Sequence, residues 1–247
     1  GAIWARHLRQ ILVSDGWTAV PDHPETYIKV HGDGTKTVLT AYVDDLLMAG
    51  AKKKEMWESL RKHVATTPPE PLKRILGVNV DRAPGAVYYS MDGYMKQSID
   101  MYTAACGPLP SKKVSCPGMT ISSDWAHKPE LCAPGRNGKH AASLLMKLLF
   151  AARMCRMDCQ HSIVSLSRAI SRWSVLDDLR MQHLFQYVRD NTELSLQCKV
   201  KKVVDMSELE LHLYVDADHA GAHDTCRSHS GGVIRVETAD KSVVSTI

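Results

Sequence analysis

The sequence lacks the features of secreted and membrane-spanning proteins. It has no Cys-x-x-Cys pair, its seven cysteines are an odd number, and no signal-peptide pattern opens it. The longest apolar stretch, 141–155, is interrupted by Lys147 and Arg153. It is also shorter than the ~20 residues that a membrane span needs. Repeats and low-complexity tracts are absent too. These absences favour an intracellular protein with reduced thiols and no membrane attachment.

The composition is that of an ordinary globular protein. Of the 247 residues, 44% are hydrophobic and 23% are charged, which is enough for a sizeable core in one large domain or two smaller ones. The formal net charge of +4 is compatible with nucleic-acid binding but does not indicate it. The chain begins with Gly1 and ends inside a predicted strand, so we expect a piece of a longer polypeptide.

The first fifty residues predict a helix followed by strands. Apolar residues from Trp4 to Leu12 recur at helical spacing and predict an amphipathic helix that ends near residue 15. Two runs rich in β-branched and aromatic residues, 26–30 and 37–43, flank a glycine-containing turn and predict a hairpin. An apolar run resumes after Asp44 and Asp45. The sequence therefore places both aspartates at a turn between two strands.

The rest of the chain alternates between strand and helix patterns. Further helices are predicted at 52–64, at 92–102 and in three segments between 140 and 190, the last capped by Asp177 and Asp178. Strands are predicted at 72–81, 86–89, 209–216 and 233–237. The proline-rich stretch 106–138 is interpreted as a loose connection.

The adjacent carboxylates of Asp44 and Asp45 are the strongest candidate for chemistry. Two such charges repel by about 4 kcal/mol at 4 Å and an effective dielectric of 20, so a bound cation would favour this arrangement. Hard oxygen ligands suit Mg²⁺ or Mn²⁺. The alternative is a solvated turn, since aspartate is a common turn residue. The dipeptide alone favours that alternative.

The surrounding sequence resembles the reverse transcriptases of copia-type retrotransposons. Residues 37–50, with Tyr42-Val43-Asp44-Asp45 between two strands, are similar to the YVDD signature of the palm domain. Further segments match the family's collinear motifs: 1–12, 75–78 ("FLGI"), 145–158 ("LLYLA…TRPD", with Met157 for the proline), 166–168 ("LSR") and 184–192 ("RYLKGT"). Only YVDD is specific by itself. The shared order of the segments extends the resemblance over nearly the whole chain.

The resemblance implies roles for particular residues. Asp44 and Asp45 would be catalytic, metal-binding aspartates, while Tyr42 and Val43 would lie near the primer terminus. The family also uses a third aspartate on an earlier strand and a fingers region, and we expect neither in this chain. The basic run Lys52, Lys53 and Lys54 is a candidate for phosphate contacts, and a solvated helix face is the alternative explanation.

A second segment resembles the start of the family's ribonuclease H module. Residues 216–221 and 227–232 are similar to "DADWAGD…RRSTSGY", with His219, Ala222 and Cys226 as departures. Asp216 would be a catalytic metal ligand, and Asp218 would have a supporting role. We expect the remaining catalytic carboxylates of the module to come after residue 247. The alternative is a zinc site, whose ligands would be His219, His223, Cys226 and His229.

We therefore expect an α+β protein in three parts: part of a reverse-transcriptase palm (1–90), a mostly helical thumb and connection region (91–204, with a loose linker at 106–138), and the start of a ribonuclease H-like mixed sheet (205–247). The implied function is RNA-directed DNA synthesis with ribonuclease H activity, dependent on Mg²⁺ or Mn²⁺. The implied partners are template RNA, DNA primer, deoxynucleotides and the rest of a Pol polyprotein, in a cytoplasmic particle or the nucleus. The alternative is a non-catalytic remnant of a decayed transposon, which would keep the motif without the activity.

Overall fold

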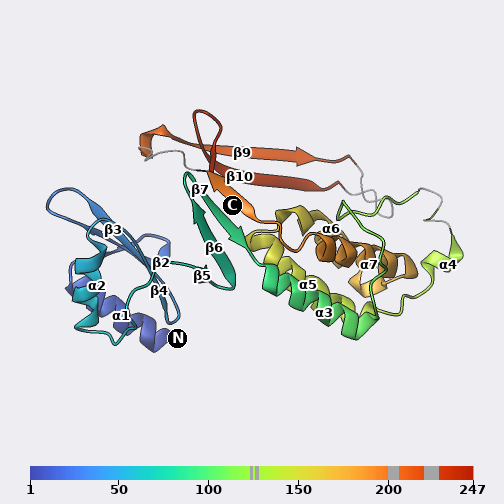
Figure 1. Ribbon diagram of the computed structural model, residues 1–247, viewed down its shortest axis with the longest axis horizontal. Coiled ribbons are helices and arrows are strands. Elements are labelled where there is room, and N and C mark those ends of the chain that lie inside the picture. Colours follow the sequence, from blue (N-terminus) through green and yellow to red (C-terminus); the bar gives the residue numbers. More distant parts are fainter. Residues whose placement is uncertain (123–124, 126–127, 200–205, 220–227, 247) are drawn as a thin grey trace. The chain divides into compact units, whose positions relative to one another are not determined.

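The computed structural model describes residues 1–122, 125, 128–199, 206–219 and 228–246 (Figure 1). It contains both helices and sheets, which confirms the predicted α+β class. The chain forms two compact units, Gly1–Ile75 and Leu76–Ile247. The sequence had suggested a first boundary near residue 90. The structure divides the chain earlier because β6 (Val78–Ala83) and β7 (Ala86–Ser90) form a sheet with the distant strand β8 (Leu196–Lys199).

The first unit is an antiparallel four-stranded sheet with two helices. The strand order β1-β2-β3-β4 follows the sequence, which hairpin connections explain. Its core includes the buried residues Leu8, Leu12, Leu39 and Leu60. The elements are α1 (Ala2–Ser14), β1 (Thr18–Val20), β2 (His23–Val30), β3 (Lys36–Tyr42), β4 (Asp45–Gly50), α2 (Lys53–Arg61) and, at the end of the unit, β5 (Arg74–Ile75).

Strand β3 shows why this sheet forms. Every second residue, Thr37, Leu39 and Ala41, is buried, while the residues between them are less buried or exposed. A period of two puts one side of a strand against a core. The pairing of β3 with β4 runs without a break from Thr37 opposite Gly50 to Tyr42 opposite Asp45. The hairpin therefore carries the candidate aspartates at its tip.

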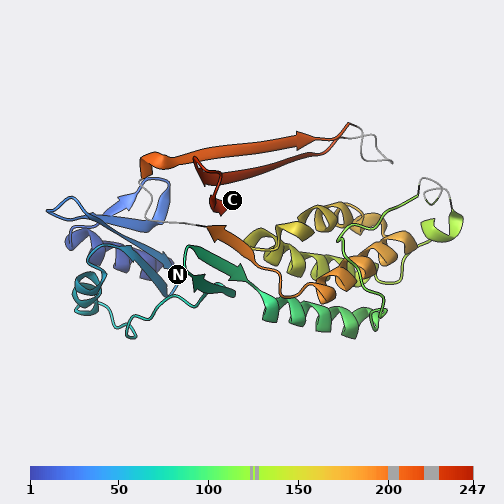
Figure 2. The ribbon, with the colours of Figure 1, turned by 45° about the horizontal axis from the view of Figure 1, so that its top comes forward.

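The helices of the second unit lie beside one another (Figure 2) and share one apolar core. Leu144, Leu148, Leu184 and Phe185 are among its fully buried side chains. The predicted helices are confirmed at nearly the expected positions, as α3 (Asp92–Cys106), α5 (Gly138–Met154), α6 (Gln160–Ser167) and α7 (Val175–Asp190). Short helical segments are α4 (Pro129–Cys132), η2 (Met157–Cys159), η3 (Ile170–Arg172) and η4 (Met206–Glu208).

Two local predictions in this unit need correction. Helix α7 is capped by Ser174, whose hydroxyl accepts from the Asp177 backbone N–H while the Asp177 carboxylate accepts from the Ser174 N–H. The predicted cap residue Asp177 is thus the second member of a capping box. The predicted strand 72–81 is two strands, because Leu76 (φ 50°) and Gly77 (φ 80°) adopt left-handed backbone conformations between them.

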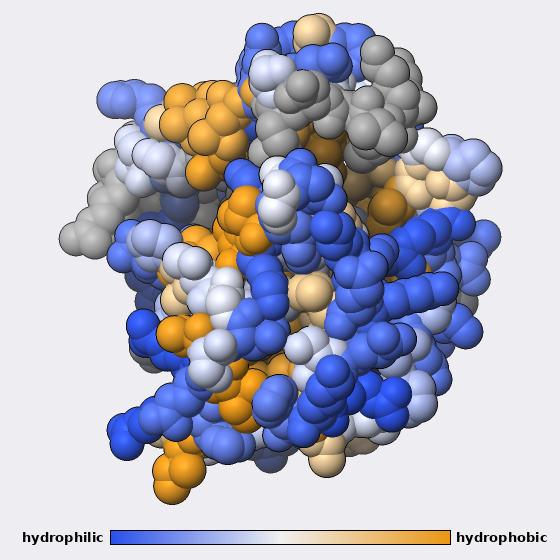
Figure 3. Space-filling model, turned by 90° about the vertical axis from the view of Figure 1, so that its left-hand side faces the viewer, coloured by the Kyte–Doolittle hydropathy of each residue, from blue (hydrophilic) through white to orange (hydrophobic). Residues whose placement is uncertain are grey.

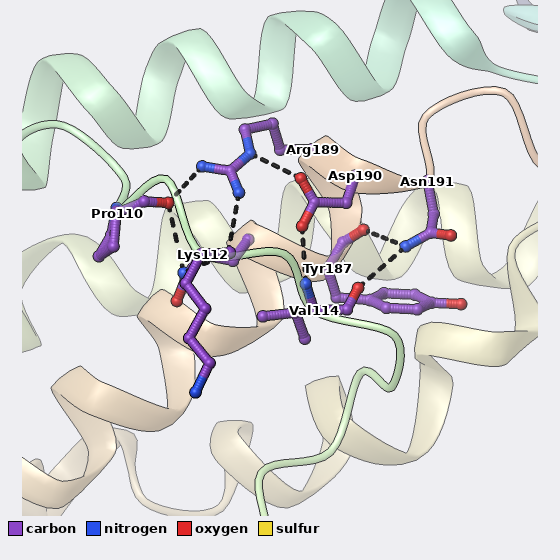
Figure 4. A network of polar contacts seen from close by, with 8 residues as sticks. Pro110, Lys112, Val114, Tyr187, Arg189, Asp190 and Asn191 are labelled. Carbon is purple, nitrogen blue, oxygen red and sulfur yellow. Dashed lines mark hydrogen bonds and ion pairs between the residues drawn. The ribbon is translucent and has the colours of Figure 1, made fainter.

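The segment 110–116 has no helix or strand, as predicted, but it is bound along helix α7 (Figure 4). The Arg189 guanidinium donates to the carbonyl oxygens of Pro110 and Lys112 at 2.5 and 3.2 Å. The Asp190 carboxylate accepts from the Val114 N–H at 2.8 Å. Polar side chains of α7 therefore satisfy backbone groups that a loop leaves unpaired.

The last strands form an antiparallel sheet in the order β11-β10-β9. They are β9 (Leu209–Ala217), β10 (Ser230–Thr238) and β11 (Val243–Thr246), and β9 and β10 pair in continuous register. The predicted alternation along β9 is present, but its apolar side is open: Leu211 is 72% exposed and Val215 is 71% exposed. Among the described residues, nothing covers this face.

Candidate functional site

The motif Tyr42-Val43-Asp44-Asp45 forms the tip of the β3–β4 hairpin. Tyr42 and Asp45 are the last paired residues of the two strands, so Val43 and Asp44 are the two loop residues. Of these two, only Val43 has a positive φ, of 55°. Positive φ at the first loop position is typical of a type II′ turn, which usually has glycine there. The predicted turn between two strands is confirmed.

Val43 is strained at this position. A β-branched residue with positive φ clashes with its own backbone, at a cost of about 1–3 kcal/mol. The indole N–H of Trp4, on helix α1, donates to the Val43 carbonyl oxygen at 2.6 Å. This contact joins residues 39 positions apart. The sequence had suggested a core position for Trp4, and no local pattern indicates its contact with the turn.

All four motif side chains reach solvent. Tyr42 is 56% exposed and Val43 is 60% exposed, and Asp44 and Asp45 are exposed as well. Figure 3 shows hydrophobic residues at several places between the hydrophilic residues of one face of the molecule. An open pair of carboxylates matches the oxygen ligands that Mg²⁺ and Mn²⁺ prefer. Within the described ranges, however, no group of three or more His, Cys, Asp or Glu side chains is arranged to hold a metal ion.

The three lysines at the start of α2 differ in their surroundings. Lys52 has a positive φ of 51° and its ammonium lies 2.8 Å from the Asp33 carboxylate. That hydrogen bond, together with those from Thr35, holds the pKa of Asp33 well below its usual range. Lys53 and Lys54 are exposed at the beginning of the helix. They are the better candidates for phosphate contacts, because Lys52 already has an acidic partner.

Asp216 lies on β9 in the second unit, opposite Gly231 of β10. Its side chain is exposed, and one carboxylate oxygen accepts from the Ala217 N–H at 2.9 Å. The neighbouring Asp218 accepts from the His229 backbone N–H at 2.5 Å and lies 3.0 Å from the His229 ring Nδ1. Asp218 therefore joins the two ends of the loop that connects β9 and β10.

The alternative zinc site cannot be assembled from described residues alone. His219 and His229 are described, whereas His223 and Cys226 lie outside the described residues. The Nδ1 atom of His229 is hydrogen-bonded to the Asp218 carboxylate. Only the Nε2 atom of His229 is therefore left to bind a metal. The six cysteines in the described parts of the chain form no disulfide.

Sequence reasoning missed a buried ionic cluster in the second unit. The guanidinium of Arg156, which is 1% exposed, lies 3.0 and 2.8 Å from the two carboxylate oxygens of Asp158. The Tyr187 hydroxyl donates to the same carboxylate at 2.8 Å. The family resemblance included Arg156 and Asp158 in the segment similar to "TRPD", but it assigned no role to the pair. A charged pair two residues apart gives no sign of its burial, because burial depends on the distant helix α7.

Comparison with known proteins relates the chain to transposon-encoded proteins. It is similar to a protein of Saccharomyces cerevisiae (strain S288c) named for the transposon Ty5-1, with 21% identity over 244 residues. The similar region covers 94% of this chain and 72% of the yeast protein. No protein-family model matches the chain, and no solved structure matches it. None of the helices in the described ranges is long and apolar enough to cross a membrane.

Proposed function

We propose that the chain is the palm-to-ribonuclease H region of a copia-type retrotransposon reverse transcriptase. Two observations together carry the proposal. Asp44 and Asp45 lie at the tip of a hairpin with a two-residue loop, and the chain is similar to a transposon protein over 94% of its length. A hairpin tip projects carboxylates beyond the sheet, where nucleic acid and a metal ion can reach them. The strained backbone of Val43 also supports the proposal, because such residues cluster at functional sites.

The proposal assigns a role to each candidate residue. Asp44 and Asp45 would hold Mg²⁺ or Mn²⁺, which when bound neutralises charge that develops during phosphoryl transfer. The exposed rings and methyl groups of Tyr42 and Val43 would contact the primer end. Lys53 and Lys54 would attract the phosphate backbone, with Lys52 held by Asp33. Asp216 would contribute to the cleavage of the RNA strand of a hybrid.

The substrates and partners follow from the same proposal. They are template RNA, a DNA primer and deoxynucleotides, with the remainder of a Pol polyprotein supplying further carboxylates and nucleotide contacts. Because no third metal ligand joins Asp44 and Asp45 among the described residues, the 247-residue chain by itself should not extend a primer on an RNA template.

A binding measurement tests the proposal without requiring turnover. The affinity of the chain for a fluorescent RNA–DNA primer-template is measured by anisotropy in EDTA and in Mg²⁺ at matched ionic strength. The wild-type chain should bind more tightly in Mg²⁺. The double variant Asp44→Asn/Asp45→Asn should lose this gain. In EDTA the same variant should bind as well as the wild type or better, because two charges that repel phosphate are gone.

Asp22→Asn is the matched control. Asp22 is exposed at the turn between β1 and β2 in the same unit, and its φ of 61° is one that asparagine tolerates. This variant loses one negative charge at a hairpin turn but should keep the Mg²⁺-dependent gain. Equal gains in the wild type and in the Asp44/Asp45 variant would contradict the proposal.

A non-catalytic transposon remnant is the second candidate. It would account for the absence, among the described residues, of any group of three or more potential metal ligands without requiring ligands from outside the chain. The genomic reading frame around the coding sequence separates the two candidates. An open frame that encodes a further aspartate strand before this region and further acidic residues after it supports the polymerase. A frameshift or stop codon on either side supports the remnant.

A further inference from the structure

Helix α1 contacts the β3–β4 turn through a hydrogen bond from the side chain of Trp4. The Trp4 indole N–H donates to the Val43 carbonyl oxygen at 2.6 Å, and both residues belong to the first unit. Trp4 is only partly buried, at the edge of the core that includes Leu8 and Leu39. Packing alone would allow any large apolar side chain at this position. What distinguishes tryptophan here is the N–H group of its ring, which donates the hydrogen bond to Val43.

The bonded carbonyl belongs to the peptide unit that joins Val43 to Asp44. Rotation about the Val43 N–Cα bond would turn this carbonyl away from the Trp4 indole and would move the backbone and side chain of Asp44 with it. Such a rotation, from the left-handed region to negative φ, would relieve the clash of a β-branched residue at positive φ. A hydrogen bond to the carbonyl opposes it.

We infer that Trp4 is a positioning residue that holds the turn in the conformation presenting Asp44 and Asp45 as a metal-binding pair. The inference rests on the proposed function for the role of the metal, but the conformational part stands without it. Trp4 does not touch the reacting groups. It acts through the backbone of Val43, so its loss should alter the turn while leaving the unit folded.

The test uses Trp4→Phe in the complete chain, which keeps an aromatic ring and removes the donor. Trp57→Phe is the matched control, because Trp57 packs against the same core and its indole nitrogen makes no hydrogen bond to a described residue. Mn²⁺ affinity is measured by water proton relaxation. Trp4→Phe should weaken it about two- to tenfold, the range for the loss of one hydrogen bond. Trp57→Phe should change it less than about twofold.

A second background separates positioning from packing. In the Val43→Gly variant, residue 43 adopts the left-handed conformation without strain, so the hydrogen bond from Trp4 is no longer required to hold the turn. Trp4→Phe should then weaken Mn²⁺ binding less than about twofold. Exchange broadening of the Asp44 and Asp45 amide resonances, recorded without metal, should appear in Trp4→Phe and be small when Val43→Gly is also present. Ring-current shifts would occur in both backgrounds and do not produce broadening.

The outcomes distinguish the inference from the proposed function. Sharp, unbroadened Asp44 and Asp45 resonances in Trp4→Phe, or equal effects of that substitution in the valine and glycine backgrounds, would overturn the positioning role. Broadening as expected, in a chain whose wild type binds no Mn²⁺ at this turn, would keep the positioning role and reject the metal-binding function.

Discussion

Replacing Asp158 with alanine should destabilise the second unit more than most single substitutions would. The wild-type carboxylate accepts two hydrogen bonds from Arg156, at 3.0 and 2.8 Å, and one from Tyr187 at 2.8 Å. Arg156 is 1% exposed, and its Nη1 atom already makes no hydrogen bond to a described residue. In the variant, a buried guanidinium would remain without its countercharge.

The structure sets the size of the effect. Removing one partner of a buried ion pair costs about 3–5 kcal/mol. Because the Asp158 side chain is 31% exposed, water can partly replace it, and we expect about 3 kcal/mol, near the low end. For a unit of this size, that loss lowers the melting temperature by roughly 6–12 °C.

Urea denaturation followed by circular dichroism measures the loss. The double variant Asp158→Ala/Arg156→Met provides the control, because it removes the orphaned charge together with its partner. It should recover part of the lost stability. If Asp158→Ala costs less than about 1 kcal/mol, or if adding Arg156→Met brings no recovery, the argument from a buried, uncompensated charge is wrong.

The same cluster predicts a response to acid. Burial raises the pKa of Asp158, but the hydrogen bonds and charge of Arg156 and the bond from Tyr187 outweigh it, so the folded-state pKa lies below the ordinary value of 3.8. A depressed pKa contributes stability that is fully present above the unfolded value and is lost as the pH falls through the folded value. Below about pH 4, the wild type should therefore lose its advantage over Asp158→Ala.

Three further predictions concern other parts of the chain. Ser174→Ala should cost about 1 kcal/mol in urea denaturation, because the first turn of α7 loses its cap. Gly50→Ala should cost about 2–3 kcal/mol in the same assay, because Gly50 has a φ of 106° and an added Cβ would collide with the Lys36 carbonyl. Iodoacetamide should label the exposed Cys116 in the native chain, whereas Cys159, whose pKa burial raises to about 12, should react only after unfolding.

Local sequence patterns were sufficient to predict the regular elements of the fold. Helix α1, the β3–β4 hairpin and helices α5 and α7 follow apolar periodicities, and the structure places them where those periodicities indicate. The position of Asp44 and Asp45 at a turn came from the same local signals, because two apolar strands flank them.

Features that depend on distant contacts could not be predicted from local pattern. The segment 110–116 looks unstructured in sequence, yet Arg189 and Asp190 bind its backbone from helix α7. The left-handed Leu76, which divides a predicted strand, has no sequence signal either, because leucine rarely adopts that conformation. The hydrogen bond from Trp4 to the β3–β4 turn spans 39 positions, so no local periodicity could predict it.

Paramagnetic NMR with Mn²⁺ tests the central claim most directly. Substoichiometric Mn²⁺ is added to the ¹⁵N-labelled chain, and the loss of amide signal is recorded at each residue. The proposed function predicts saturable, selective loss around Asp44 and Asp45, which Asp44→Asn/Asp45→Asn abolishes and Asp22→Asn does not. Selective loss centred elsewhere in the first unit, or no selective loss at the β3–β4 turn, would contradict the assignment of these aspartates as metal ligands.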